Sequence, residues 1–407
     1  MVAKAAHSAP SILFAWALGG LVALLGAFVL SELAARRPNG CGPYAYLGEA
    51  FHPIVAFAFG WTALLVSFTG GVAAAALLFA GYFTSLTGLA ASPTVVAIGA
   101  LVLITLVGCF GVRQNGNVQN ALTLLKLAAI AGLLISVLVA HPAAAADAGA
   151  TAVAPLGGLQ GIGAAIVPVL FAYNGAVVVN FMATETKNPG RALPVGLWAG
   201  IAVSIVVYLA VNAVCLYVLG VGKLALTATP ISDAVEAAVG QFGGRLVACA
   251  IALSTLSFIG NRTLTIPRLY HAMARDGLFF RQVAAVHPAT RVPVAAVLLQ
   301  GAVAIAMAAT GSYARILDYV VFATYIFAGL SAIALVVLRT RDARTNSKLH
   351  GDFRMPWHPV STIAVAVISF AVVADTFVHY PAESVTCLGI IAAAVPAYAV
   401  WRFARSS

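Results

Sequence analysis

The stretch LFAYNGAVVVNFMATETKNPGRALP, residues 170–194, begins in one of the most apolar parts of the chain and interrupts it with polar, helix-weakening residues. Tyr173, Asn174 and Gly175 stand in a row where an apolar helix would otherwise continue. Asparagine competes with the helix for backbone hydrogen bonds, and glycine weakens a helix by about 1 kcal/mol. The stretch predicts a break in the helix. The alternative is an intact helix in which Gly175 only permits close packing.

The composition predicts an integral membrane protein. Of the 407 residues, 62% are hydrophobic and 8% are charged, whereas soluble domains carry about 25% charged residues. So few polar side chains could not cover a core of this apolarity. The net charge of +10 is spread in short clusters between apolar runs, which is not the basic face of a nucleic-acid-binding protein.

Apolar segments long enough to cross a bilayer, about 20 residues, recur along the whole chain. Strand-like alternation is absent, so a closed β-barrel is not expected. The predicted spans are 11–35, 53–86, 93–109, 118–140, 161–182, 193–219, 244–271, 292–310, 315–338, 357–379 and 385–403. The fold class is therefore an all-α membrane protein with about 11 transmembrane helices.

Arginine and lysine gather in alternate connections between these spans, most densely at 339–354. Connections of this kind face the cytoplasm, which predicts a multi-pass protein of the cytoplasmic (inner) membrane with a cytoplasmic C-terminus. The odd number of spans then places Met1 outside and suggests that one span is missing in front. We interpret Arg36, Arg37 and the arginines of 339–354 as orientation signals and lipid-headgroup contacts.

Four segments resemble motifs of the amino acid–polyamine–organocation superfamily of permeases. They occur in the family's order over nearly the whole chain, and the resemblance is closest to the L-amino-acid-transporter-like and bacterial permease branches. The segments are SELAARRPNGCGPYAYLGEAF (31–51), GVRQNGNVQNALTLLKL (111–127), the opening stretch (170–194) and NRTLTIPRLYHAMARDG (261–277).

The resemblance implies a LeuT-type bundle of two inverted five-helix repeats plus two further helices. Residues 1–407 would form a single transporter domain, with an incomplete first repeat at 1–140, a second repeat at about 161–338 and two additional helices at about 357–403. The family's first helix carries a Gly-x-Gly-Ile-Phe-like break that binds the substrate carboxylate, and no such segment occurs here. We therefore expect a truncated or mis-started chain or, as the alternative, a degenerate copy; in each case this half of the site is lacking.

The resemblance also implies roles for residues of the predicted break. Phe171 matches the aromatic lid over the substrate. Ala172, Tyr173 and Gly175 match the unwound turn whose carbonyl groups receive the substrate amino group. Asn174 occupies a variable position and is expected to tune selectivity.

Lys126 is a second candidate, because a buried cation inside a span is costly and is usually functional. It lies roughly 12 Å from the start of its predicted span at about 1.5 Å per residue. In proton-coupled relatives a lysine at this place stands where sodium binds in sodium-coupled ones, which makes Ser254 and Ser257 candidate partners. The alternative is a lysine that snorkels toward the lipid headgroups.

Carboxylates at the predicted cytoplasmic ends of spans are expected to form salt bridges of an inner gate or solvated pairs. They are Glu32, Glu49 and Glu185. Glu185 and Arg191, which flank the Asn-Pro of the opening stretch, are the candidates for the cytoplasmic gate.

The predicted function is a secondary active transporter of amino acids, working by alternating access with proton coupling or exchange. No acidic residue lies near Phe171, which favours neutral L-amino acids over polyamines or arginine. The alternative is a truncated or degenerate membrane protein that keeps the permease scaffold without transporting. Expected partners are an amino acid, protons and the lipid bilayer.

Several other classes of function are not expected. No nucleophile–base pair indicates an enzyme, and neither the five cysteines nor the eight histidines have metal-ligand spacing. We predict no metal, cofactor or nucleic acid. We also expect no disulfide-linked heavy chain, because the short outer connection 87–92 contains no cysteine.

Overall fold

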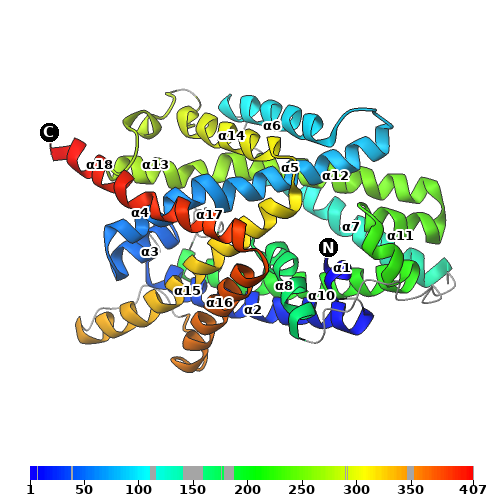
Figure 1. The fold of residues 1–407 in the computed structure, drawn as a ribbon, viewed down its shortest axis with the longest axis horizontal. Coiled ribbons are helices and arrows are strands. Elements are labelled where there is room, and N and C mark those ends of the chain that lie inside the picture. The colour runs from blue at the N-terminus through cyan, green and yellow to red at the C-terminus, as the bar shows by residue number, and fades with distance from the viewer. Residues whose placement is uncertain are drawn as a thin grey trace.

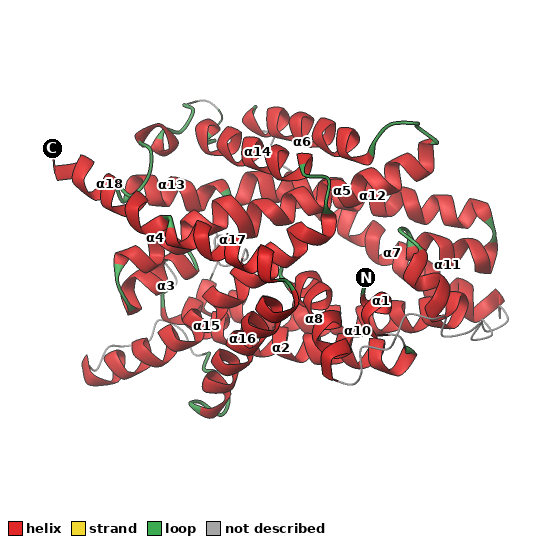
Figure 2. Cartoon of the chain, viewed as in Figure 1, coloured by secondary structure: helices red, strands yellow, loops and turns green. Residues whose placement is uncertain are grey.

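The computed structural model describes residues 1–6, 8–37, 40–110, 116–140, 159–175, 177, 188–288, 290, 292–345 and 353–406. These residues form helices joined by loops and turns, and no strand occurs among them (Figure 2). The first elements are α1 (Val2–Ala6), α2 (Ala9–Arg36), α3 (Pro43–Ala50), α4 (Pro53–Thr62), the π-helical turn η1 (Ala63–Ser67), α5 (Phe68–Thr87), α6 (Pro93–Cys109) and α7 (Gly116–Ala140).

The later elements complete the bundle. They are α8 (Leu159–Tyr173), α10 (Pro189–Leu226), α11 (Pro230–Val239), α12 (Gln241–Thr265), α13 (Pro267–Arg275), the 3-10 turn η3 (Arg281–Ala284), α14 (Val294–Ala309), α15 (Tyr313–Thr345), α16 (Val360–His379), α17 (Pro381–Ala392) and α18 (Ala394–Ser406).

The predicted transmembrane architecture is confirmed. Among the described residues, 7 helices are long and apolar enough to cross a membrane, and shorter apolar helices occupy the remaining predicted spans. The long ones are Ala9–Arg36, Pro53–Thr87, Arg191–Leu226, Gln241–Arg275, Tyr313–Thr345, Val360–His379 and Pro381–Arg402, and the shorter ones are Pro93–Cys109, Thr123–Val137, Gly163–Tyr173 and Val294–Ala309. Each lies within or overlaps one predicted range, so the chain is a multi-pass membrane protein.

Most of the long helices run along the longest axis of the molecule (Figure 1). Helices far apart in sequence pack together: α10 lies along α2, α12 along α5, and α14 along α6. The C-terminus lies at the same end of the long axis as α3, and α11 lies at the opposite end (Figure 1). We call the end of α2 and α15 that carries Arg36, Arg37 and Arg339 the basic end.

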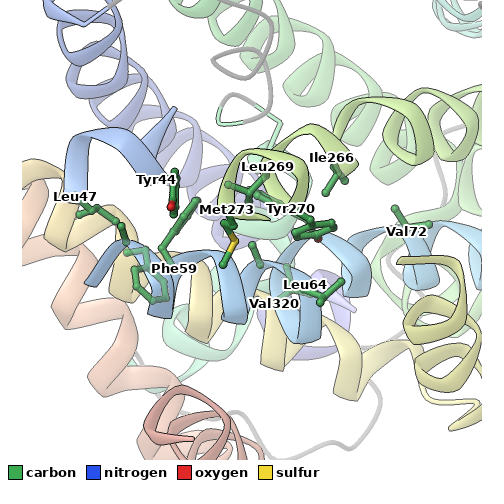
Figure 3. Packing of buried hydrophobic residues seen from close by; sticks show 14 of the residues in the cluster. Tyr44, Leu47, Phe59, Leu64, Val72, Ile266, Leu269, Tyr270, Met273 and Val320 are labelled. Atoms are coloured by element: carbon green, nitrogen blue, oxygen red, sulfur yellow. The ribbon is translucent and has the colours of Figure 1, made fainter. Parts of the chain in front are cut away.

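The largest buried cluster joins α4 and α5 to α13 (Figure 3). Leu269, Tyr270 and Met273 are completely buried there. A Cβ atom on Gly60 of α4 would overlap the sulfur of Met273, so the absence of a side chain at Gly60 gives the methionine its place between the two helices. This contact holds α13 against α4, and α13 in turn continues from α12, which carries part of the site described below.

Local sequence explains where the helices next to the site begin and bend. The Ser8 hydroxyl accepts a hydrogen bond from the Ser11 N–H at 3.3 Å and caps α2. The long α10 consists of two helical segments that meet at Gly220, whose φ of 70° suits glycine. The π-helical turn η1 is continuous with α4 and α5. Single π-helical turns inserted in an α-helix often occur at functional sites.

Candidate functional site

The helix α8 ends at Tyr173, immediately before the predicted break. Asn174 and Gly175 form a turn rather than a continued helix. The N–H of Asn174 donates to the carbonyl oxygen of Phe171 at 3.1 Å, and the N–H of Gly175 donates to that of Tyr173 at 2.7 Å. The α-helical hydrogen-bond pattern therefore stops within the motif.

Phe171, the predicted lid residue, and Asn174, in the turn, contact different parts of α15. The ring of Phe171 packs edge-on against Tyr313, the first residue of α15, with ring centroids 6.4 Å apart. The amide of Asn174 donates to the hydroxyl of Thr324 in α15 at 3.1 Å. Both contacts tie the end of α8 to α15, at positions about three turns apart along that helix.

Ala172 and Tyr173, which lie between Phe171 and Asn174 in the motif, contact α10 and α2. The hydroxyl of Tyr208 in α10 donates to the carbonyl oxygen of Ala172 at 3.2 Å. Tyr173 is buried, and its ring packs edge-on against both Tyr208 and Trp16, with centroids 5.1 and 6.0 Å away. The carbonyl of Ala172 thus already has one donor, and its second lone pair is available to a further donor.

A cavity of about 240 Å³ opens beside the break. A single water occupies about 30 Å³ of liquid, so the space accommodates a small solute. Four of the five predicted binding residues line it, Tyr173 being the exception. The lining residues are Ser67, Phe68, Gly71, Val72, Ala75, Leu78, Phe171, Ala172, Asn174, Gly175, Ser254, Thr255, Phe258, Arg262, Tyr313 and Val320. We call this space the outer cavity.

A second and smaller cavity, of about 90 Å³, lies on the other side of Asn174. We call it the inner cavity. Asn174, Ser67 and Phe68 line both spaces. Along α15 the outer cavity touches Tyr313 and Val320, whereas the inner cavity touches positions 324–331, which lie closer to the basic end. The Asn174–Thr324 hydrogen bond therefore stands between two consecutive cavities.

The structure brings part of the predicted proton-coupling group to the site. Ser254 lines the outer cavity. Ser257, one turn further along α12, is buried and is not among the lining residues. Lys126 lies in α7, and its side chain falls outside the part of the chain that the structure describes. The role of Lys126 stays a prediction.

The predicted gate pair is only partly described. Glu185 lies outside the described residues. Arg191 is exposed in the first turn of α10, and no carboxylate of the described residues forms an ion pair with it. The pairing of these two residues stays a prediction as well.

A cluster of ion pairs closes the basic end of the bundle. Glu32 is completely buried, and its carboxylate accepts hydrogen bonds from Arg36 at 2.8 Å, from Arg339 at 2.6 Å and from the backbone N–H of Met355 at 2.6 Å. A buried carboxylate is tolerable only when its lone pairs are satisfied in this way. The salt bridges expected for Glu32 are present.

The remaining members extend this network, which we call the Glu32 cluster, to the loop after α2. Asp342 accepts from Arg36 at 2.7 Å and from Arg37 at 2.9 Å. Arg37 also pairs with the predicted gate residue Glu49 at 2.7 Å. The neighbouring carboxylates of Glu49 and Asp342 raise the pKa of Arg37 above its ordinary value, despite burial. The cluster consists of Glu32, Arg36, Arg37, Glu49, Arg339 and Asp342.

The sequence interpretation of three of these arginines was incomplete. Arg36, Arg37 and Arg339 were expected to orient the chain and contact lipid headgroups, but they form ion pairs among α2, the α2–α3 loop, α3 and α15. Arg36 and Arg37 have carboxylate partners only 4 and 12 positions away, in Glu32 and Glu49, whereas the partners Glu32 and Arg339 are 307 positions apart. No local pattern reports such a pairing.

Sequence reasoning also missed Arg262, which lines the outer cavity. Its guanidinium carbon lies 4.9 Å from the ring centroid of Phe258. The rule that singled out Lys126, a charge inside an apolar span, applies equally to Arg262 within the predicted span 244–271. That signal was present in the sequence.

Comparisons with known proteins agree with this architecture. A family model described as amino acid permease matches residues 1–395. The chain is 28% identical over 370 residues to the serine/threonine exchanger SteT of Bacillus subtilis, covering 89% of this chain and 83% of the relative. It is 29% identical over 351 residues to the b(0,+)-type amino acid transporter 1 of Oryctolagus cuniculus, covering 80% and 68%. The methylthioribose transporter of Bacillus subtilis is 28% identical over 388 residues, covering 89% and 80%.

Proposed function

The chain belongs to the amino acid permease family, and on that premise we propose that it is a secondary active transporter of neutral L-amino acids that works by alternating access. The single observation that carries the proposal is the outer cavity at the end of α8, where a broken helix meets α5, α12 and α15. Secondary transporters bind their substrates at such discontinuous helices near the middle of the bilayer.

The pair of cavities supports alternating access. A transported solute has to leave one compartment, pass the binding site and enter the other. The outer and inner cavities share Asn174, so a solute that displaces the Asn174–Thr324 hydrogen bond would pass from one to the other. The Glu32 cluster would close the path beyond the inner cavity, and its opening would separate α2 from α15.

The lining of the outer cavity supports a neutral amino acid. Hydroxyl and amide groups are available from Ser67, Asn174, Ser254 and Thr255, and no Asp or Glu of the described residues lines the space. A net cation would find no carboxylate partner there. The serine/threonine exchanger is named for small neutral substrates, which fits this lining.

We further propose coupling to protons or to the exchange of a second amino acid, with Lys126, Ser254 and Ser257 as the coupling group. Ser254 supports this assignment because it reaches the outer cavity from α12. The distribution of arginine and lysine supports an inner-membrane location with the C-terminus in the cytoplasm.

Uptake by the purified chain in liposomes tests the proposal. Vesicles loaded with unlabelled serine or leucine, or carrying an inward proton gradient, are mixed with the same amino acid in radiolabelled form. The expected result is uptake above that of empty liposomes, reduced by excess unlabelled neutral amino acid and not by putrescine. Lack of uptake and of binding across a panel of neutral amino acids would contradict the proposal and favour a non-transporting scaffold.

A further inference from the structure

Arg262 places a positive charge inside the outer cavity. Ser254, Phe258 and Arg262 follow one another at intervals of four residues in α12, which puts them on the same face of the helix. All three line the cavity. The guanidinium lies over the Phe258 ring at 4.9 Å, a cation–π contact that directs the arginine along the helix toward the cavity.

Within the part of the chain that the structure describes, this charge has no carboxylate partner. The described acidic residues form no ion pair with Arg262, and none of them lines the outer cavity. An uncompensated cation inside a membrane protein is costly, and a cation–π contact offsets only part of that cost. In the Glu32 cluster, by contrast, every arginine has a carboxylate partner.

An anion bound in the cavity would therefore supply the negatively charged partner that Arg262 lacks. A guanidinium presents parallel N–H donors that match the two oxygens of a carboxylate. Every amino acid carries an α-carboxylate, whereas amines and polyamines carry none. The same positive charge repels ligands with a net positive charge and so discriminates against them.

We propose that Arg262 binds the carboxylate of the transported amino acid and makes that carboxylate a requirement for binding. The assignment rests on the proposed function and adds to it the group that selects the substrate. The substrate's amino group would then lie toward the turn at Ala172–Gly175, on the other wall of the cavity. Neutral amino acids satisfy both walls. Decarboxylated amines lack the carboxylate, and the side-chain charge of the amino acid arginine is repelled by Arg262.

The test is a thermodynamic cycle between Arg262 and the ligand carboxylate. Dissociation constants of leucine and of leucine methyl ester, which lacks the negative charge, are measured on wild type, Arg262→Gln and Arg262→Lys in detergent. We expect wild type to prefer leucine over the ester and Arg262→Gln to reduce that preference about 10- to 100-fold, the range of a charge-assisted hydrogen bond. Arg262→Lys should retain part of the preference because the charge remains.

The matched control is Arg245→Gln, an exposed arginine of the same helix that does not line the cavity. It should leave the preference unchanged. If Arg262 only supported the fold, both ligands would weaken equally and the preference would survive in Arg262→Gln, which would overturn the inference while leaving the proposed function intact. If wild type binds no amino acid, the proposed function fails and the inference falls with it. Should Arg262→Gln aggregate, Arg262→Lys decides: an undiminished preference overturns the inference.

Discussion

The carboxylate of Glu32 in α2 accepts two hydrogen bonds from the guanidinium of Arg339 in α15, both at 2.6 Å. Both oxygens of Glu32 are engaged, and the side chain is completely buried. This fork-to-fork pair is the strongest type of ionic hydrogen bond in proteins. It joins two helices whose separation would be needed to open the inner cavity toward the basic end.

Replacing Glu32 by glutamine should destabilise the protein strongly. The glutamine keeps the shape but removes the charge, which leaves the buried Arg36 and the partly buried Arg339 without this carboxylate. Breaking one side of a buried ion pair costs about 3–5 kcal/mol. The thermal unfolding midpoint in detergent should fall by many degrees.

The control for this change is Glu49→Gln at the exposed edge of the cluster, where the carboxylate side chain is 38% exposed. An exposed pair contributes about 0–1 kcal/mol, so its midpoint should barely move. Equal effects of the two substitutions would contradict the role given to Glu32.

A fall in pH should lower the stability of the folded protein through protonation of His358, which lies in the loop before α16. Burial and the nearby guanidiniums of Arg339 and Arg36 lower the pKa of His358 below its ordinary value of 6.5, and Glu32 opposes this only in part. Because the folded-state pKa is the lower one, the folded protein binds this proton less readily than the unfolded chain. The contribution to stability is present above about pH 6.5 and is lost as the pH falls through the folded-state pKa.

The measurement is the unfolding midpoint between pH 7.5 and 5, compared for wild type and His358→Gln. The variant cannot take up this proton, so its midpoint should fall less than that of wild type over the same range. Parallel curves for the two proteins would show that His358 does not contribute.

Gly175→Leu should abolish amino acid uptake while leaving the protein folded. Gly175 is exposed, and a Cβ atom there would meet no atom within 4 Å. The leucine would therefore not disturb packing, but its side chain would enter the outer cavity that Gly175 lines. Uptake in liposomes and a melting curve separate the two effects.

The matched variant is Gly196→Leu in α10, another exposed glycine with open space around it. It does not line either cavity and should transport normally. Normal uptake by Gly175→Leu would remove the break in α8 from the proposed site.

Lys126→Met should remove the dependence of uptake on external pH. A lysine that loads and releases a proton in each cycle links transport to proton concentration, and methionine keeps the length of the side chain without the charge. Initial uptake rates between pH 5.5 and 8 provide the measurement. An unchanged pH profile would favour the interpretation that Lys126 snorkels to the headgroups.

The sequence alone predicted the all-helical membrane architecture and the places of its apolar helices, because a long apolar run bounded by charges is typical of a transmembrane helix and rare in soluble proteins. It also located the end of α8, since Asn174 and Gly175 weaken a helix locally. The side-chain contacts of the site could not be predicted in the same way. Tyr208 reaches Ala172 across 36 positions and Asn174 reaches Thr324 across 150, and such pairings depend on how the helices pack.

For the charged residues too, part could be predicted from the sequence and part depended on how the helices pack. The carboxylates Glu32 and Glu49 at span ends were expected to form salt bridges or solvated pairs, and both form salt bridges. The partners Arg36 and Arg37 lie 4 and 12 positions away in the sequence, but the pairing of Glu32 with Arg339 depended on the approach of α2 to α15. Arg262 was visible as a charge inside an apolar segment, but only the cavity beside α12 gives it a location where a ligand could meet it.

The two closures along α15 differ greatly in strength. Between the cavities stands one neutral hydrogen bond, from Asn174 to Thr324, with a net worth of about 0.5–1.5 kcal/mol. At the basic end stand several interlocked charges around Glu32. Thermal fluctuation alone would break the first bond often and the second set rarely. Water and small solutes should therefore exchange between the outer and inner cavities far faster than between the inner cavity and the compartment beyond it. Opening of the Glu32 cluster, rather than breaking of the Asn174–Thr324 hydrogen bond, would then be the slow step of passage.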